Sequence, residues 1–216
     1  MPITSVTLDL DGTLLDTVPD LAGAANAMLL ELGLPPRSEE EVRRFVGRGI
    51  GKLVERCIGD AAVDHAQALA VFRRHYARCN GHGAQPYPGV REGLECFRAR
   101  GLPMGVITNK SAEFTGPLLA ATGLAPYFRF ALSGDSLPEK KPHPRPLLEA
   151  CARLNSTPPG NLHIGDSRHD AAAARAAGCP VFLVPYGYNE GQDVRGLDCD
   201  AIVATLMDAA ARIESL

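Results

Sequence analysis

Two aspartates near the start of the chain, Asp9 and Asp11, lie at the end of an apolar segment in the run D-L-D-G-T-L. Side chains alternate along a strand, so these two carboxylates point the same way while the leucine between them points oppositely. Two carboxylates on one face are costly to ionise together unless a cation lies between them or one keeps its proton. The pair therefore indicates metal or acid–base chemistry, and the alternative is a turn or a helix cap.

Polar side chains also follow three later apolar segments. They are Thr108 and Asn109 in V-I-T-N-K, Lys140, Lys141 and His143 in K-K-P-H-P, and Asp166 and Asp170 in H-I-G-D-S-R-H-D. Singly, each group has an ordinary explanation as a turn residue, a solvated basic loop or a helix cap. Independent caps would not be expected to bring acids, a hydroxyl, an amide and a lysine to successive strand ends.

Short apolar segments alternate with helical patterns through most of the chain. Strands are expected over 4–10, 103–107, 130–132, 161–164 and 180–184, and helices over 90–100, 112–122, 146–154 and 170–177. Strands that alternate with helices form a parallel sheet covered by helices on both faces. Ligands bind at the carboxyl edge of such a sheet. We therefore expect a Rossmann-like α/β fold whose carboxyl edge gathers these side chains.

The stretch from about Asp16 to Gly83 breaks this alternation, because helical patterns follow one another without a strand between them. One helix start is well marked: Ser38 followed by Glu41 forms a capping-box pattern, which explains the acidic run beside it. The sequence predicts an α/β core domain built from residues 1–15 and 84–216, interrupted by an all-helical cap domain at residues 16–83.

The inserted segment contains the run R-F-V-G-R-G-I-G-K. Its glycines let main-chain amides turn toward an anion, and the helix that follows adds its positive N-terminus. Three basic side chains accompany them, Arg44, Arg48 and Lys52. Our hypothesis is that this run recognises an anionic group of a substrate, and the alternative is a helix-to-helix turn with solvated bases.

Composition narrows the class of protein. The 216 residues carry a formal net charge of −3, which supplies no basic field for nucleic acid. No apolar run approaches the length of a membrane span. Six cysteines are scattered without a C-x-x-C, so we expect reduced thiols in a cytoplasmic protein. The histidines show no zinc spacing.

In order, D-x-D-G-T, T-N, K-P and G-D-x-x-x-D resemble the motifs of the haloacid dehalogenase superfamily, with a helical cap inserted after the first motif, and the match spans essentially the whole chain. Within the superfamily, F-V-G-R-G-I-G-K-L-V-E-R, S-G-D-S-L-P-E-K-K-P-H-P, G-D-S-R-H-D and V-P-Y-G-Y-N-E-G resemble the bacterial phosphoglycolate phosphatases. His169 departs from the pattern, which has Asn there, and puts the local hydrogen bonding in doubt.

The resemblance implies a phosphoryl-transfer mechanism with an aspartyl intermediate. Asp9 would attack phosphorus, which divides the hydrolysis into two easier displacements. Asp11 would protonate the leaving alcohol and then deprotonate the attacking water.

The resemblance also implies a magnesium ion and a phosphate site. Mg²⁺ prefers hard oxygen ligands, which Asp9, Asp166 and the main-chain carbonyl of Asp11 could provide, with Asp170 supporting them from outside the ligand set. Lys141, which directly precedes the proline, would tie Asp9 to the phosphoryl oxygens. The remaining phosphate oxygens would be bound by Thr108, Asn109 and the amides around Gly12.

These inferences predict a magnesium-dependent phosphatase of a small phosphomonoester, with 2-phosphoglycolate as the substrate, acting as a monomer or homodimer. Three alternatives stay open: a phosphatase of another metabolite such as an amino-sugar 6-phosphate, a cap-bearing phosphomutase, and a binding module without activity. Fold and nucleophile do not determine the leaving group.

Overall fold

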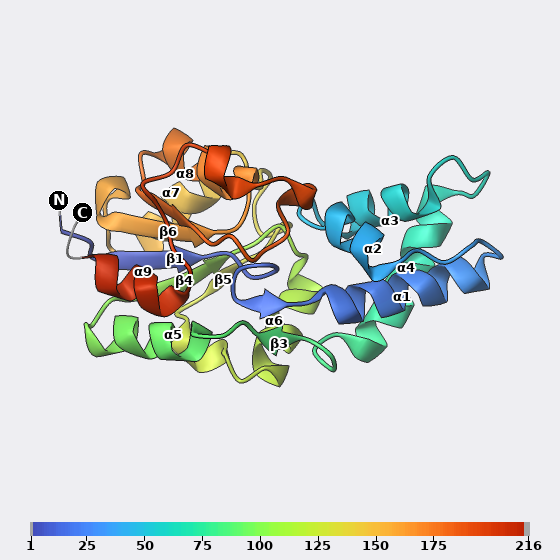
Figure 1. Cartoon of the computed structure of the whole chain (residues 1–216), viewed down its shortest axis with the longest axis horizontal. Coiled ribbons are helices and arrows are strands. Elements are labelled where there is room, and N and C mark those ends of the chain that lie inside the picture. Colours follow the sequence, from blue (N-terminus) through green and yellow to red (C-terminus); the bar gives the residue numbers. More distant parts are fainter. Residues whose placement is uncertain (1, 214–216) are drawn as a thin grey trace.

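A six-stranded parallel sheet lies at the centre of the protein, in a computed structural model that describes residues 2–213 (Figure 1). Its strand order is β5-β4-β1-β6-β7-β8. The strands are β1 Ser5–Leu8, β4 Met104–Ile107, β5 Ala131–Leu132, β6 Asn161–Gly165, β7 Val181–Leu183 and β8 Ala201–Ile202. Because helices cover both faces, the central strands are buried along their whole length, and the polar residues of β1 and β6, Ser5, Thr7, Asn161 and His163, hydrogen-bond to one another. The predicted α/β fold is confirmed, and β8 is a strand that the sequence pattern did not reveal.

Five helices pack against this sheet. They are α5 Val90–Ala99, α6 Ala112–Ala121, α7 Arg145–Arg153, α8 Arg168–Ala177 and α9 Leu206–Arg212. The connecting loops contain four single-turn 3₁₀ helices, η1 Ala125–Tyr127, η2 Pro158–Gly160, η3 Asn189–Gly191 and η4 Val194–Gly196. Helices α5 and α9 pack together on one face, and α7 and α8 pack together on the other. The predicted helices correspond to α5 through α8, whereas α9 was not expected.

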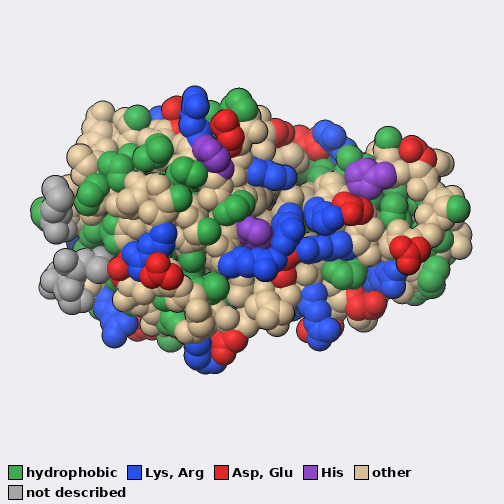
Figure 2. All heavy atoms as spheres, turned by 90° about the horizontal axis from the view of Figure 1, so that it is seen from above, with side chains coloured by type: hydrophobic (Ala, Val, Ile, Leu, Met, Phe, Trp, Pro, Cys, Tyr) green, Lys and Arg blue, Asp and Glu red, His purple; other side chains and the backbone are tan. Residues whose placement is uncertain are grey.

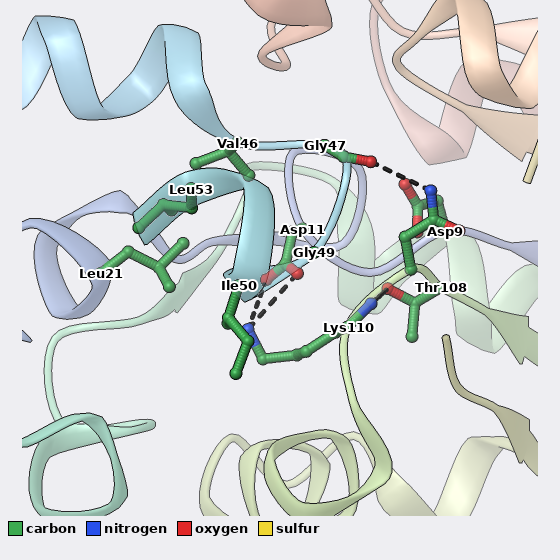
Figure 3. Close-up of a pocket in the computed structure, with 11 residues that line it drawn as sticks. Asp9, Asp11, Leu21, Val46, Gly47, Gly49, Ile50, Leu53, Thr108 and Lys110 are labelled. Atoms are coloured by element: carbon green, nitrogen blue, oxygen red, sulfur yellow. Dashed lines mark hydrogen bonds and ion pairs between the residues drawn. The ribbon is translucent and has the colours of Figure 1, made fainter. Parts of the chain in front are cut away.

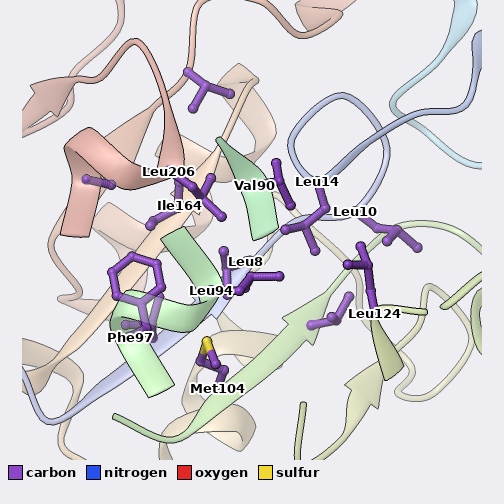
Figure 4. Close-up of a cluster of buried hydrophobic side chains, with 14 of the residues drawn as sticks. Leu8, Leu10, Leu14, Val90, Leu94, Phe97, Met104, Leu124, Ile164 and Leu206 are labelled. Atoms are coloured by element: carbon purple, nitrogen blue, oxygen red, sulfur yellow. The ribbon is translucent and has the colours of Figure 1, made fainter. Parts of the chain in front are cut away.

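The largest hydrophobic cluster joins the sheet to α5, α6 and α9 (Figure 4). Leu8 and Ile164 from the central strands meet Leu94 and Phe97 from α5, and all four side chains are fully buried. Burying one such side chain contributes about 1.5–3 kcal/mol. This packing fixes β1 and β6 side by side, and therefore fixes where their polar ends lie.

A second lobe of four helices extends beyond the carboxyl end of β1 (Figure 1). These helices are α1 Val18–Glu31, α2 Glu39–Phe45, α3 Ile50–Ile58 and α4 His65–Cys79. They have their own hydrophobic cluster, in which α1 and α4 make the most extensive contact. The predicted capping box is present at the start of α2, where Ser38 accepts from Glu41 N and Glu41 accepts from Ser38 N.

The chain passes between the two lobes through a pair of short antiparallel strands, β2 Leu15–Asp16 and β3 Gln85–Pro86. Among the described residues, no helix is both long and apolar enough to span a membrane. All six cysteines carry free thiols.

Asp20, in the first turn of α1, ties together the two passages of the chain between the lobes. Its buried carboxylate accepts hydrogen bonds from the amides of Gly81, Gly83 and Ala84, at 2.8, 2.7 and 3.2 Å. Three amide donors on one carboxylate hold the returning segment against α1.

Replacing Asp20 with Ala should lower the free energy of unfolding by about 2–3 kcal/mol, because hydrogen bonds to a charged group are lost and the amides are left without their acceptor. Urea unfolding followed by circular dichroism measures this change. Asp60→Ala, at an exposed position of the helical lobe, is the control and should shift stability by less than about 0.5 kcal/mol. Equal effects of the two variants would contradict this role for Asp20.

Candidate active site

Polar side chains from successive loops meet at the carboxyl edge of the sheet, facing the helical lobe. Asp9 and Asp11 follow β1, Thr108 and Asn109 follow β4, and Asp166 follows β6. Lys141 lies between β5 and α7, and Asp170 lies in the first turn of α8. The expected convergence of these residues is therefore found, because neighbouring parallel strands end at the same edge.

One buried ammonium group joins two of the acids. Lys141 Nζ lies 2.9 Å from Asp9 Oδ1 and 2.6 Å from Asp170 Oδ1, and only 2% of the lysine side chain is exposed. The neighbouring Lys140 instead donates from Nζ to the main-chain carbonyl of Arg48. The structure thus separates the two adjacent lysines, and the one directly before the proline lies against Asp9.

Asp170 has no free oxygen to offer a ligand. Its Oδ1 accepts from Lys141 and contacts His163 Nε2 at 3.1 Å, while its Oδ2 accepts from Ser167 N and Oγ. Burial works against ionisation, yet Lys141 and His163 hold the pKa of Asp170 well below its usual value. Asp170 is therefore held in its ionised form beside Lys141.

The pKa values of Asp9 and Asp166 are shifted upward, opposite to that of Asp170. Burial, with Asp170 nearby, raises the pKa of Asp166 to about 7, even though Thr13 Oγ1 and Tyr188 N donate to its carboxylate. Burial also raises the pKa of Asp9 well above its usual range, and Asp170 and Asp166 add to the effect against Lys141. Neither acid has enough positive charge beside it to favour its ionised form.

Oxygens of Asp9, Asp166 and Asp170 all lie within 4.8 Å of one another. Hard carboxylate oxygens with raised pKa values suit a divalent cation, which would supply the missing charge. Because the oxygens of Asp170 are already engaged, Asp9 and Asp166 are the carboxylates free to coordinate. The Asp11 carboxylate does not belong to this group.

The Asp11 carboxylate is held by two other residues. Thr17 Oγ1 donates to it at 2.7 Å, and Lys110 Nζ lies 3.0 and 3.3 Å from its two oxygens. Although burial works against the charge, Asp11 raises the pKa of Lys110 above its usual value. Sequence reasoning missed Lys110, although the residue directly follows the T-N pair and a buried cation was needed near two acids.

Besides Lys141, three further residues expected to bind phosphate oxygens lie at this edge, and their contacts differ. Thr108 lines the cavity beside Asp9. Asn109 donates from Nδ2 to the carbonyls of Gly47 and Lys141 and leaves a buried Oδ1 without a partner. Gly12 donates its amide to the Leu15 carbonyl, so it is not a free donor here.

Gly12 matters for a different reason, because it allows close approach. Its φ is +87°, and a Cβ at this position would lie 2.4 Å from Asp166 Oδ2. Only glycine combines this conformation with that contact.

The basic residues of the helical lobe fall outside the enclosed site. Arg44 and Lys52 are ion-paired with Glu40 and Glu55 on the lobe surface. Arg48 lies 3.0 Å from Glu190, a residue of η3 that also pairs with Arg56 and Arg168. Figure 2 shows Lys and Arg side chains gathered where the two lobes meet.

Glu190 therefore links the lobes, since Arg48 and Arg56 come from the helical lobe and Glu190 from the core. The three arginines lower the pKa of Glu190 to about 2 against the effect of burial. His169 Nε2 lies 3.5 Å from the same carboxylate. The motif residue that departs from the expected Asn thus lies beside this contact, and it lines a small hollow together with Asp9 and Asp166.

An enclosed cavity of about 30 Å³ lies between Asp9, Asp11 and the lobe (Figure 3). Its apolar wall comes from the lobe and its polar wall from the core; the lining residues are Asp9, Asp11, Leu21, Val46, Gly47, Gly49, Ile50, Leu53, Thr108, Asn109 and Lys110. Such a volume holds one or two water molecules. A metabolite needs more room than this cavity provides.

Comparison with known proteins agrees with the site. Residues 6–184 match the haloacid dehalogenase-like hydrolase family. Phosphoglycolate phosphatase of Thiobacillus denitrificans is 50% identical to this chain, and the match covers 99% of this chain and 96% of the relative. Phosphoglycolate phosphatase of Nitrosospira multiformis is also 50% identical, and the match covers 99% of this chain and 97% of the relative. A crystal structure of a predicted phosphoglycolate phosphatase from Haemophilus somnus superposes with a TM-score of 0.92 at 32% identity, covering 97% of each chain.

The raised pKa values predict that a divalent cation binds more tightly as pH rises. Below about pH 7 Asp166 carries a proton that the cation must displace, and Asp9 adds to this effect, so affinity should weaken about tenfold per pH unit for each proton displaced. Isothermal titration with Mn²⁺ at about pH 6 and about pH 8 measures the difference. Asp166→Asn should weaken binding at both values, and an affinity independent of pH in the unaltered protein would refute the prediction.

Proposed function

Because this chain belongs to the haloacid dehalogenase-like hydrolase family, we propose that it is a magnesium-dependent phosphatase that converts 2-phosphoglycolate to glycolate and inorganic phosphate. The observation that carries the chemistry is the pairing of Asp9 with Lys141 beside Asp166. The substrate rests on relatives that carry the name phosphoglycolate phosphatase at 50% identity over nearly the whole chain.

Asp9 acts as the nucleophile in this proposal. Its carboxylate oxygen attacks phosphorus, the bond from phosphorus to the glycolate oxygen breaks, and Asp11 gives that oxygen a proton. Asp11 then takes a proton from water, whose oxygen attacks phosphorus, and the bond to Asp9 breaks to release inorganic phosphate. Asp9 and Asp11 return to their starting states, so the cycle balances.

The supporting residues reduce charge repulsion and hold the geometry. Lys141, kept charged by Asp170, faces the side of Asp9 on which phosphate oxygens would gather. Thr17 and Lys110 fix the orientation of Asp11. Mg²⁺, when bound by Asp9 and Asp166, would neutralise charge between the nucleophile and the phosphoryl group.

The helical lobe, residues 16–83, serves as a cap in this proposal. A cavity of about 30 Å³ is too small for the substrate, so the described arrangement corresponds to a closed state. Opening would admit 2-phosphoglycolate, and closure would exclude water beyond the reacting molecule. The contacts of Glu190 with Arg48 and Arg56 are in place to hold the closed state.

Phosphate release from 2-phosphoglycolate, measured beside sugar, amino-sugar and nucleotide monophosphates, tests the proposal. The glycolate ester should have the highest kcat/KM, and EDTA should abolish turnover. Asp9→Asn should lower kcat by at least about 10³-fold because the nucleophile is lost. Asp60→Asn, on the exposed surface of the helical lobe, is the matched control and should leave turnover unchanged.

Three other outcomes would point elsewhere. A higher kcat/KM for another ester would retain the mechanism and reject the substrate. Activity only with a bisphosphate activator would favour a phosphomutase. No turnover of any ester with Mg²⁺ present would favour a binding module.

A further inference from the structure

A carboxylate on the substrate raises a problem that the catalytic residues do not solve. If the proposed function is correct, the leaving group is glycolate, whose carboxylate must enter the closed cavity with the phosphoryl group. Moving a carboxylate out of water is strongly unfavourable unless a cation and hydrogen-bond donors receive it. A residue that meets this need should be a cation in the cavity wall, close to the nucleophile.

The basic residues of the lobe do not meet this requirement. Arg44 and Lys52 are ion-paired on the surface and do not line the cavity. Arg48 faces Glu190 and lines a separate, more open hollow outside the cavity. In this arrangement the three basic side chains of the glycine-rich run are paired outside the cavity, whereas Gly47, Gly49 and Ile50 of the same run line it.

Lys110 is the one cation among the described residues that line the cavity beside Asp9. Its side chain is 2% exposed, and in Figure 3 it extends from the loop after β4 into the space below Ile50 and Gly49. The centroid of the Tyr76 ring, from α4 of the lobe, lies 4.9 Å from its Nζ. A cation against an aromatic face in a dry site is stabilised without using up a hydrogen-bond donor.

An ammonium group has three donors, and the Asp11 oxygens account for two of them. Tyr76 Oη makes no hydrogen bond in this structure, so one donor of the ammonium group is left for a second anion. The other lobe side chains at this cavity are Leu21, Val46, Ile50 and Leu53, which provide an apolar surface for a methylene group and no donor for a hydroxyl-rich leaving group. The wall suits a short acid better than a sugar.

Lys110 also belongs to the α/β core and not to the helical lobe. It is the third residue after β4, on the same sheet edge as Asp9, so it keeps its place beside the nucleophile when the lobe moves. The core alone would then bind both ends of the substrate, and the lobe would close over them.

We propose that Lys110 is the specificity-determining residue of this site and that it selects phosphomonoesters whose leaving group carries a carboxylate. This inference rests on the proposed phosphatase function for its setting. It goes further because it assigns the recognition of the carboxylate to a core lysine, which also orients Asp11, and not to the lobe.

A matched pair of substrates separates recognition from orientation of Asp11. 2-Hydroxyethyl phosphate differs from 2-phosphoglycolate only in having CH₂OH in place of the carboxylate. The unaltered enzyme should prefer the carboxylated ester by roughly 100-fold in kcat/KM, and Lys110→Met should bring this ratio to within a few-fold of one. If Lys110 only orients Asp11, the variant will slow both esters equally and leave the ratio unchanged, which overturns the inference.

Lys140→Met is the control variant, because it removes a lysine that lies outside the cavity and should preserve the ratio. Thermal unfolding of each variant reports whether it folds. If Lys110→Met does not fold, Lys110→Arg, which keeps the charge, should retain a preference of at least about tenfold. A loss of preference in that folded variant, with Lys140→Met unchanged, would instead show that charge is insufficient and reject the selective role.

Binding to the unaltered protein tests the inference without turnover. 3-Phosphonopropionate, which resembles 2-phosphoglycolate but cannot be hydrolysed, should bind at least about tenfold more tightly than propylphosphonate in the presence of Mg²⁺. Equal affinities would overturn the role of Lys110 while leaving phosphatase activity intact. Conversely, tight binding of the carboxylated compound by a protein that hydrolyses no ester would reject the proposed function and retain the inference.

Discussion

The buried ammonium group of Lys141 is the interaction on which the site depends. It lies between Asp9 and Asp170. Asp166 is close to both of these acids, and without the lysine the repulsion among the three carboxylates would disfavour their ionised forms. The Asp170 carboxylate also contacts His163 and accepts a hydrogen bond from Ser167, so it stays ionised and keeps the lysine charged. The other two acids are left short of positive charge, and this shortage makes the site suited to a divalent cation.

Close packing of backbone against carboxylates keeps this arrangement rigid. A Cβ at Gly187 would lie 2.2 Å from the Cβ of Asp166, and a Cβ at Gly165 would lie 2.2 Å from the Cγ of Asp170. No larger residue fits at either position without displacing an acid. The glycines in the motifs therefore hold the acids at short range, in addition to allowing turns.

The two lobes divide the chemistry between them. The core edge supplies the acids and both buried lysines, whereas the lobe supplies apolar side chains and the Tyr76 ring. Glu190 joins the halves through arginines of the lobe. Because the charges that face the reacting groups belong to the core, movement of the lobe changes access and water content, and excluding water strengthens the interactions of those charges.

The sequence by itself determined the parallel sheet, the helical insertion, and the convergence of Asp9, Lys141 and Asp166, because apolar periodicity and strand ends are local features and parallel strands share an edge. It did not reveal β8 and α9, whose signals are short. Tertiary structure alone decided that Lys110 meets Asp11 across 99 residues and that Arg48 faces Glu190 across 142. The first pairing depends on how the loops after β1 and β4 fold together, and the second depends on how the lobe sits against the core, and spacing along the chain carries no record of either.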